Sequence, residues 1–251
     1  ETVERPAAPE QKSKNAPAAE EQKWLLDLTA NGTEQFPFYV WMKLQREVML
    51  DYGQALLLPL PNRGVPELRQ AIAGHLADFR GMRVEPENIL IGAGTDFLYN
   101  LLMQLLGREK IYGLEDPGYL KAGRIYALNG ARCVPVPIEH FGAPVETVER
   151  SGAQVLHLSP SHQFPTGAVT PIARRQALLR WAREGNGRYI IEDDYDSEFR
   201  FTGRPIPPLQ SIDQGGRVIY VNTFSRTLSP SFRISYMVLP PELLQRYQQQ
   251  L

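Results

Sequence analysis

The sequence predicts an α/β fold with a mostly parallel central sheet and helices on both of its faces. Short apolar segments that read as strands alternate along the chain with segments of helical period, and polar residues follow the strands. Strands that are separated by helices run parallel, because each helical crossover returns the chain to the same edge of the sheet. In such sheets ligands bind at the carboxyl ends of the strands, so the functional residues are expected there.

Two helical segments are expected before the first strand. Residues 36–53, FPFYVWMKLQREVMLDYG, are dense in aromatic side chains, and we expect them to form a helix that packs onto the rest of the fold. Residues 65–79, VPELRQAIAGHLADF, repeat apolar side chains with the period of a helix. That period places four apolar side chains on one stripe: Leu68, Ile72, Leu76 and Phe79.

Strands and helices then alternate to the end of the chain. Residues 88–94 predict a strand, and residues 95–107 predict a helix that Gly107 ends, because glycine favours the conformation found just after a helix. Further strands are expected at 111–118, 132–137, 154–159, 188–196, 217–225 and 233–240. Helical segments lie among them at 119–130 and 171–185, and a Thr- and Ser-rich turn joins the last two strands.

The two ends of the chain differ from this pattern. Residues 1–22 are rich in Pro, Ala and charge, so they cannot bury enough apolar surface to offset the entropy lost on ordering. We expect a flexible linker or tail over 1–22 and a folded domain over 23–240. The chain begins with Glu1 and stops inside a helical segment over 241–251. We therefore expect it to be a piece of a longer protein.

The composition is that of a globular protein and argues against several functions. Of the 251 residues, 43% are hydrophobic and 22% are charged, which suffices for one substantial core. The formal net charge of -1 offers no general attraction to nucleic acids or membranes. A single cysteine, Cys133, excludes an intrachain disulfide and fits a reducing, cytoplasmic compartment. No apolar run is long enough to span a bilayer.

Two of the strand ends carry features suited to a ligand. Gly94 and Thr95 stand between a strand and a helix, where free backbone amides and the helix dipole form a cradle for an anion. Thr95 could instead serve only as a helix cap. Tyr119 follows the strand over 111–118, where its ring could face a ligand or pack as a core tyrosine.

Carboxylates gather after the strand that begins at 188. Residues 192–199, EDDYDSEF, resemble a metal site in composition, but no partner carboxylates follow the other strands. His157 and His162 also lack carboxylate or thiol partners at the spacing of metal ligands. No metal site is therefore expected, and we interpret both histidines as structural.

A second loop suited to an oxyanion follows the strand over 217–225. It presents hydroxyls at Thr223 and Ser225 and cations at Arg226 and Arg233.

Three motifs in this order resemble one protein family. They are PSHQFPTG at 160–167, IIEDDYDSEFRF at 190–201 and TFSRTLSPSFRISYMVLP at 223–240. Together they resemble the fold-type I pyridoxal-phosphate enzymes, and in detail the aminotransferase-like domain of GntR/MocR-type transcriptional regulators. A plain aminotransferase would more usually show Asn-Pro-Thr-Gly where this chain has Phe164 before Pro-Thr-Gly. The resemblance covers about 52–251 and implies the large domain of that fold over 23–240, leading at 241–251 into a small domain that this chain lacks.

The resemblance also implies a role for each matching residue. Asp193 would face the pyridine nitrogen of pyridoxal 5'-phosphate and keep it protonated. Tyr195 would bond the phenolic oxygen of the ring, Tyr119 would stack on the ring, and Phe164 would pack against it without donating a hydrogen bond. The cofactor-binding set is completed by residues near the phosphate and in the loop after the last parallel strand: Gly94, Thr95, Thr223, Ser225, Arg226 and Arg233.

Three features depart from the family pattern. Arg226 stands where the family has the lysine that bonds covalently to the cofactor, and a guanidinium cannot supply the neutral primary amine which that bond needs. Lys121 is the last lysine in the chain, so no other lysine follows to replace it. The small domain with its substrate-binding arginine is absent, and ALLLPLPN expands the link after Tyr52. Pyridoxal phosphate would therefore be bound non-covalently at best. The sequence leaves open whether Arg226 is natural or an engineered replacement.

Three functions remain open at this point. The motifs and the linker-like N-terminal segment favour a domain that senses a small effector, an amino acid or a pyridoxal-phosphate-like molecule, within a transcriptional regulator. Such a regulator would contact DNA through a domain outside this chain and would be a cytoplasmic homodimer. The alternatives are a pyridoxal-phosphate-dependent aminotransferase, which the missing lysine disfavours, and an α/β domain that binds nothing.

Overall fold

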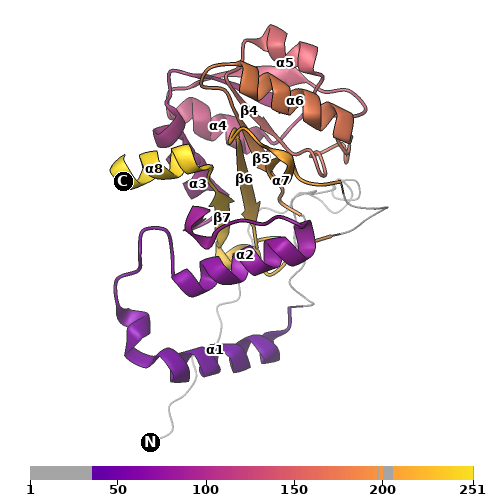
Figure 1. The fold of residues 1–251 in the computed structure, drawn as a ribbon. Helices are drawn as coiled ribbons and strands as arrows, with labels where there is room; N and C mark the ends of the chain where they lie inside the picture. The colour runs from indigo at the N-terminus through magenta and orange to yellow at the C-terminus, as the bar shows by residue number, and fades with distance from the viewer. Residues whose placement is uncertain (1–35, 197, 200–205, 251) are drawn as a thin grey trace, which may run out of the picture. The chain divides into compact units, whose positions relative to one another are not determined.

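The computed structural model describes residues 36–196, 198–199 and 206–250, and the strands in these ranges form one seven-stranded sheet (Figure 1). The strand order across the sheet is β1-β7-β6-β5-β4-β2-β3. The strands are β1 (Ile89–Gly92), β2 (Ile111–Asp116), β3 (Arg132–Pro137), β4 (Val155–Leu158), β5 (Tyr189–Asp193), β6 (Val218–Thr223) and β7 (Ser235–Val238).

The strands from β6 to β3 in this order run parallel, whereas β7 runs antiparallel to both β6 and β1. A direct turn rather than a helical crossover joins β6 to β7, and such a connection reverses the chain direction. This turn contains only the short 3-10 helix η4 (Pro230–Phe232). The prediction of a mostly parallel sheet is confirmed.

Helices cover both faces of the sheet, as predicted. One face packs against α3 (Thr95–Leu106), α4 (Leu120–Leu128) and α8 (Pro241–Gln250). The other packs against α2 (Pro66–Arg80), α5 (Val145–Ser151), α6 (Ile172–Glu184) and α7 (Leu209–Ile212). Alternate residues of a strand point to opposite faces, and accordingly Ile191 belongs to the core under α3, whereas Ile190 belongs to the core under α6.

The first predicted helix forms but does not pack as expected. Helix α1 (Phe38–Tyr52) has no buried residue, and the short 3-10 helix η2 (Gly53–Leu57) follows it. Contact with the body is made near its start, where the rings of Phe36 and Trp41 lie 5.4 and 4.4 Å from that of Phe232. The aromatic density of 36–53 predicted the helix correctly and its burial wrongly.

The predicted stripe of α2 is largely confirmed. Ile72 and Leu76 are buried, and Leu68 packs beside them. Phe79 is 47% exposed and stacks on the imidazole of His75, with ring centroids 4.5 Å apart, so it lies at the margin of the stripe.

Helix α8 begins at Pro241, where the sequence placed the start of a helix. The predicted tail over 1–22 lies outside the described residues, and the division into domains stays a prediction. Among the described residues, no helix is both long and apolar enough to cross a membrane.

Candidate ligand site at the carboxyl edge of the sheet

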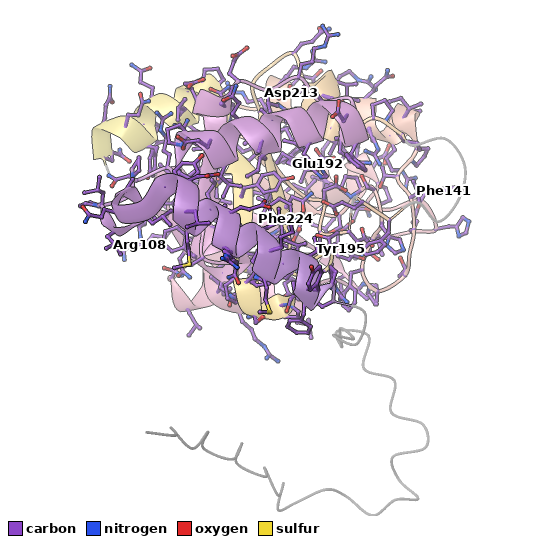
Figure 2. All side chains as sticks on the ribbon, turned by 90° about the horizontal axis from the view of Figure 1, so that it is seen from below. Arg108, Phe141, Glu192, Tyr195, Asp213 and Phe224 are labelled. Carbon is purple, nitrogen blue, oxygen red and sulfur yellow. The ribbon has the colours of Figure 1, made fainter. Side chains whose placement is uncertain are left out.

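The ends of β4, β5 and β6 bring the predicted functional loops together. Leu158 at the end of β4 pairs with Glu192 of β5, and Asp193 pairs with Val221 of β6. The residues that follow these strands therefore share one edge of the sheet, and Glu192 and Tyr195 mark it in Figure 2.

Asp193, the last residue of β5, is buried and lies at the centre of this edge. Its Oδ2 accepts a hydrogen bond of 2.5 Å from the hydroxyl of Tyr99 and lies 3.4 Å from Nε2 of His157. Its Oδ1 is buried and has no hydrogen-bond partner within residues 36–196, 198–199 and 206–250. A buried carboxylate oxygen without a donor is costly in a folded protein, so Oδ1 is suited to accept a hydrogen bond from a ligand.

The two histidines that were interpreted as structural both lie beside carboxylates of this edge. His157 contacts Asp193 and receives a second contact, 2.8 Å long, between its Nδ1 and the hydroxyl of Tyr126. His162 pairs with Asp196, and its Nδ1 lies 3.3 Å from the hydroxyl of Tyr195. The spacing along the sequence did not reveal these pairs, because one partner lies on or after β4 and the other at or after the end of β5. Within the described ranges no group of three or more His, Cys, Asp or Glu side chains could hold a metal ion.

Three aromatic rings line the site. Phe164 lies between Tyr119 and Tyr195, with centroid distances of 6.3 and 6.5 Å, and its ring is nearly perpendicular to both. Tyr119 is 38% exposed, so part of its ring remains open to a ligand. These are the rings that the family resemblance placed around a cofactor.

Gly94 and Arg233 form a cradle at the start of α3. Gly94 precedes the helix at φ 90°, a conformation that favours glycine, and a Cβ there would lie 2.3 Å from Nη2 of Arg233. Thr95 is the first helical residue, so its backbone amide and those of Asp96 and Phe97 precede the first hydrogen bond of the helix, which Leu98 donates to Gly94. Arg233 adopts φ 52°, and it is the one non-glycine residue with positive φ in the described part of the chain. Such backbone strain is typical of functional loops.

Asp96 adds a carboxylate to this cradle that the sequence did not single out. Its Oδ2 lies 2.6 Å from Nζ of Lys121 and 3.6 Å from Nη2 of Arg233. All three side chains are partly exposed, so these ion pairs are weak and can yield to another anion.

The loop after β6 is ordered by its own hydroxyl groups. Oγ1 of Thr223 donates to Oγ of Ser225 at 3.0 Å and accepts from Oγ of Ser235 at 2.8 Å. The partly buried Arg226 follows directly. Burial and the charge of Asp196 raise the pKa of Tyr195, and the positive charge of Arg226 opposes this rise. Arg226 also lowers the pKa of Tyr119 against the larger effect of burial, so its charge acts on both tyrosines of the site.

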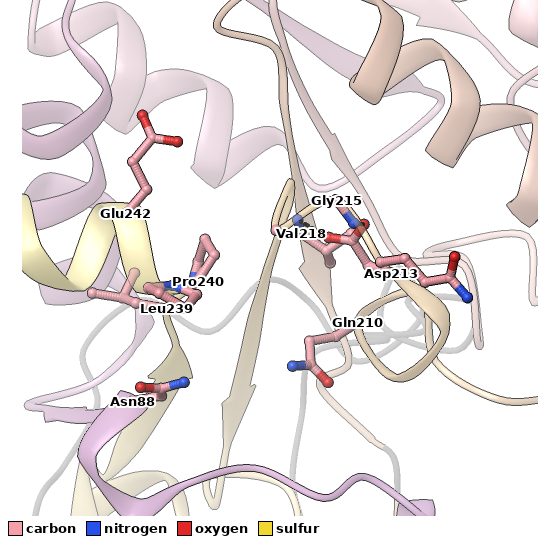
Figure 3. Close-up of a pocket in the computed structure, with 11 residues that line it drawn as sticks. Asn88, Gln210, Asp213, Gly215, Val218, Leu239, Pro240 and Glu242 are labelled. Carbon is pink, nitrogen blue, oxygen red and sulfur yellow. Dashed lines mark hydrogen bonds between the residues drawn. The ribbon is translucent and has the colours of Figure 1, made fainter.

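The opposite end of the sheet holds an open hollow of about 460 Å³. Figure 3 shows Asp213, Gly215 and Val218 on one side of it and Pro240 and Glu242 on the other. The Asp213 carboxylate already accepts hydrogen bonds from the backbone amides of Gly215, Arg217 and Val218. Because these amides occupy both carboxylate oxygens, Asp213 orders its own loop.

All ten predicted cofactor-binding residues thus lie at the carboxyl edge, at strand ends or in the segments that follow them. The structure adds Tyr99, His157, Tyr126, His162, Asp196 and Asp96 to them. That the ten residues hold a cofactor stays a prediction.

Comparison with known proteins decides the family. The family model described as aminotransferase class I and II matches residues 23–250. The chain belongs to this family. Among solved structures it resembles LysN, an α-aminoadipate aminotransferase from Thermus thermophilus complexed with N-(5'-phosphopyridoxyl)-L-leucine. The TM-score is 0.76 at 29% identity, over 87% of this chain and 58% of that chain. The predicted fold is therefore confirmed.

Its curated relatives include transcriptional regulators. It is 42% identical to the uncharacterized HTH-type transcriptional regulator YdeL of Bacillus subtilis, over 91% of this chain and 50% of that protein. It is 38% identical to the probable rhizopine catabolism regulatory protein MocR of Rhizobium meliloti, over 83% of this chain and 42% of that protein. The predicted resemblance to the aminotransferase-like domain of such regulators is confirmed. The chain spans about half the length of these relatives.

Proposed function

We propose that this chain is the effector-sensing, aminotransferase-like domain of a GntR/MocR-type transcriptional regulator, and that it binds pyridoxal 5'-phosphate or a similar ligand without a covalent bond. The full regulator would be a cytoplasmic homodimer that contacts DNA through a part outside this segment. One relative named as an HTH-type transcriptional regulator and one named as a regulatory protein support this reading of the whole protein.

The observation that carries the ligand proposal is the buried Oδ1 of Asp193, which has no donor among the residues that the structure describes. A protonated pyridine nitrogen would supply the missing donor and would form a charge-assisted hydrogen bond. Tyr119 and Phe164 would flank the ring, and Tyr195 would form a hydrogen bond with the phenolic oxygen of the ring.

The cradle fits the phosphate end of the same ligand. The space that a Cβ on residue 94 would fill is bordered by the Arg233 guanidinium, and the start of α3 offers free amides. Thr223 and Ser225 add hydroxyl groups at the end of β6. A phosphate would compete with the Asp96 carboxylate for Arg233 and Lys121. The residues present therefore fit pyridoxal phosphate at both ends.

In this proposal, Arg226 is the reason that the chain senses the ligand and does not catalyse a reaction on it. When bound, pyridoxal phosphate supplies an electron-withdrawing ring and an aldehyde that reacts with amines. Arg226 keeps a positive charge beside the site, but its guanidinium cannot attack the aldehyde. The chain would therefore bind and orient the ligand without attaching it to the protein.

The test is binding of pyridoxal phosphate to the 251-residue chain, followed by dialysis, borohydride reduction and intact-mass measurement. We expect saturable binding that dialysis removes, and no added mass after reduction. Arg226→Lys is expected to gain the mass of one phosphopyridoxyl group, whereas the matched Arg226→Gln variant is not. A stable adduct on the unmodified chain, or no saturable binding at all, would contradict the proposal.

The second candidate function is a pyridoxal-phosphate-dependent aminotransferase, which the similarity to LysN favours. Incubating the loaded chain with amino acids would distinguish the two functions. Conversion of the bound cofactor to pyridoxamine phosphate would establish the enzyme. We expect none, because the chain has no lysine after Lys121.

A further inference from the structure

Four buried side chains form a continuous hydrogen-bonded chain behind Asp193. The hydroxyl of Tyr126 (α4) meets Nδ1 of His157 (β4), Nε2 of His157 meets Oδ2 of Asp193 (β5), and the hydroxyl of Tyr99 (α3) meets the same Oδ2. Both tyrosines are fully buried, and His157 is nearly so. Such a network fixes the direction of each hydrogen bond, because no solvent is available to replace a lost partner.

The hydrogen positions follow from the chemistry of the partners. Burial raises the pKa of Tyr99 and Tyr126 well above the usual value for tyrosine, and the negative charge of Asp193 adds to the rise at Tyr99. Both hydroxyls therefore keep their protons and can donate. A carboxylate oxygen only accepts, so Nε2 of His157 must carry hydrogen to bond Asp193. In the neutral ring, Nδ1 then accepts from Tyr126.

The two oxygens of Asp193 are thereby made unequal. Oδ2 accepts from Tyr99 and His157, and Oδ1 accepts from no group in the described part of the chain. Rotation of the carboxylate would remove both donors from Oδ2. The side chain is held with a single acceptor available for a ligand.

We propose that Tyr99 and Tyr126 are positioning residues for this acceptor: Tyr99 fixes the rotation of the Asp193 carboxylate, and Tyr126 fixes the tautomer and orientation of His157. The selectivity of the site for a ring that carries an N–H group depends on both tyrosines, although neither touches the ligand. The ligand part of this inference rests on the proposed function, whereas the tautomer of His157 does not.

The first test needs no ligand. Nitrogen NMR of the chain labelled at histidine is expected to show His157 as a neutral ring that carries hydrogen on Nε2. In Tyr126→Phe the Nδ1 resonance of His157 should shift, because Nδ1 loses its donor. A wild-type His157 that carries hydrogen on Nδ1 would overturn the assignment.

The second test compares pyridoxal phosphate with its 1-deaza analogue, in which carbon replaces the ring nitrogen. The ratio of the two dissociation constants isolates the contact with Asp193. In the wild-type chain we expect pyridoxal phosphate to bind at least about tenfold more tightly, as for a hydrogen bond to a charged group. Tyr99→Phe and Tyr126→Phe are each expected to reduce this preference by about threefold or more, a fraction of that bond's contribution.

Tyr112→Phe is the matched control. Tyr112 is equally buried and packs on Tyr126 at a centroid distance of 5.0 Å, but its hydroxyl donates to the carbonyl of Gly107, away from the site. This variant should keep the wild-type preference.

An unchanged preference in both site variants, or an equal loss in the control, would overturn the positioning role. If the wild-type chain binds neither ligand, the proposed function fails, and the His157 spectrum still decides the tautomer. If a variant does not fold, the His157 spectrum of the wild-type chain still decides the tautomer.

Discussion

Asp193 faces the side of the sheet covered by α3, whereas its neighbours Glu192 and Asp194 face the side covered by α2 and α6. The carboxylate of Glu192 accepts from the backbone amides of Leu209 and Gln210 at the start of α7 and lies 3.8 Å from the guanidinium of Arg175. Asp194 lies 2.9 Å from the guanidinium of Arg80. The carboxylate of Asp193 meets Tyr99 and His157, and no arginine or backbone amide of the described residues contacts it.

These different partners distinguish two carboxylates with a structural role, Glu192 and Asp194, from one that is suited to a ligand, Asp193. Glu192 and Asp194 meet arginines from helices, so each ties a helix to the strand end. Asp194 also has one buried oxygen without a partner among the described residues, but Arg80 faces its carboxylate. Asp193 meets Tyr99 and His157 on one oxygen, has no such partner on the other, and has no arginine beside it. Its negative charge is therefore left for a cation or an N–H group to neutralise.

The largest expected effect is on stability, from breaking the pair on the α2 side. Arg80→Met leaves the fully buried Asp194 without its cationic partner, and such a loss costs about 3–5 kcal/mol in the free energy of unfolding. Urea denaturation measures this change. Arg174→Met is the control, because Arg174 pairs with the exposed Glu139, and an exposed pair contributes at most about 1 kcal/mol. Equal losses of unfolding free energy in the two variants would contradict the distinction between the buried and the exposed ion pair.

The next effect is on binding, from Asp193→Asn. The amide oxygen of asparagine would stay with Tyr99 and His157, so its NH₂ group would face the ligand, where two donors would oppose each other. We expect the affinity for pyridoxal phosphate to fall about tenfold to a hundredfold, the value of a charge-assisted hydrogen bond. Equilibrium dialysis measures the affinity.

Asp213→Asn at the opposite edge is the matched control for binding. Asp213 orders its own loop, so its replacement should lower stability and leave the affinity unchanged. If Asp193→Asn binds pyridoxal phosphate with wild-type affinity, Asp193 does not belong to the binding site.

A further effect is a pH dependence of stability to which two buried glutamates contribute. Burial raises the pKa of Glu192 to about 7, with the charge of Asp194 adding to the rise, and burial also raises the pKa of Glu115, beside the site, to about 7. Between the ordinary glutamate value and pH 7 the folded chain retains protons that the unfolded chain has released. The free energy of unfolding therefore falls as pH rises through this interval, by up to about 1.4 kcal/mol per pH unit for each group, and levels off above it.

Glu192→Gln and Glu115→Gln should each flatten part of this slope in denaturation curves measured from pH 5 to pH 8. A stability that rises over this interval would refute the assignment.

Local sequence predicted most of the strands and helices and the edge at which the site lies. It predicted the burial of α1 wrongly, because aromatic density does not reveal which surface a helix meets. It also interpreted His157 and His162 as structural, because the spacing along the chain showed no carboxylate partner. Those partners, Asp193 and Asp196, are 36 and 34 residues away in the sequence.

The sequence alone determined that no lysine stands in the loop after β6, and therefore that Arg226 cannot attack an aldehyde, because this follows from the chemistry of the side chain. It also determined the alternation that builds a parallel sheet. Only the tertiary structure decided which of three successive acidic residues has no arginine beside it. That choice depends on strand order and on helices that bring arginines to one face and tyrosines to the other, and these neighbours are distant in the chain.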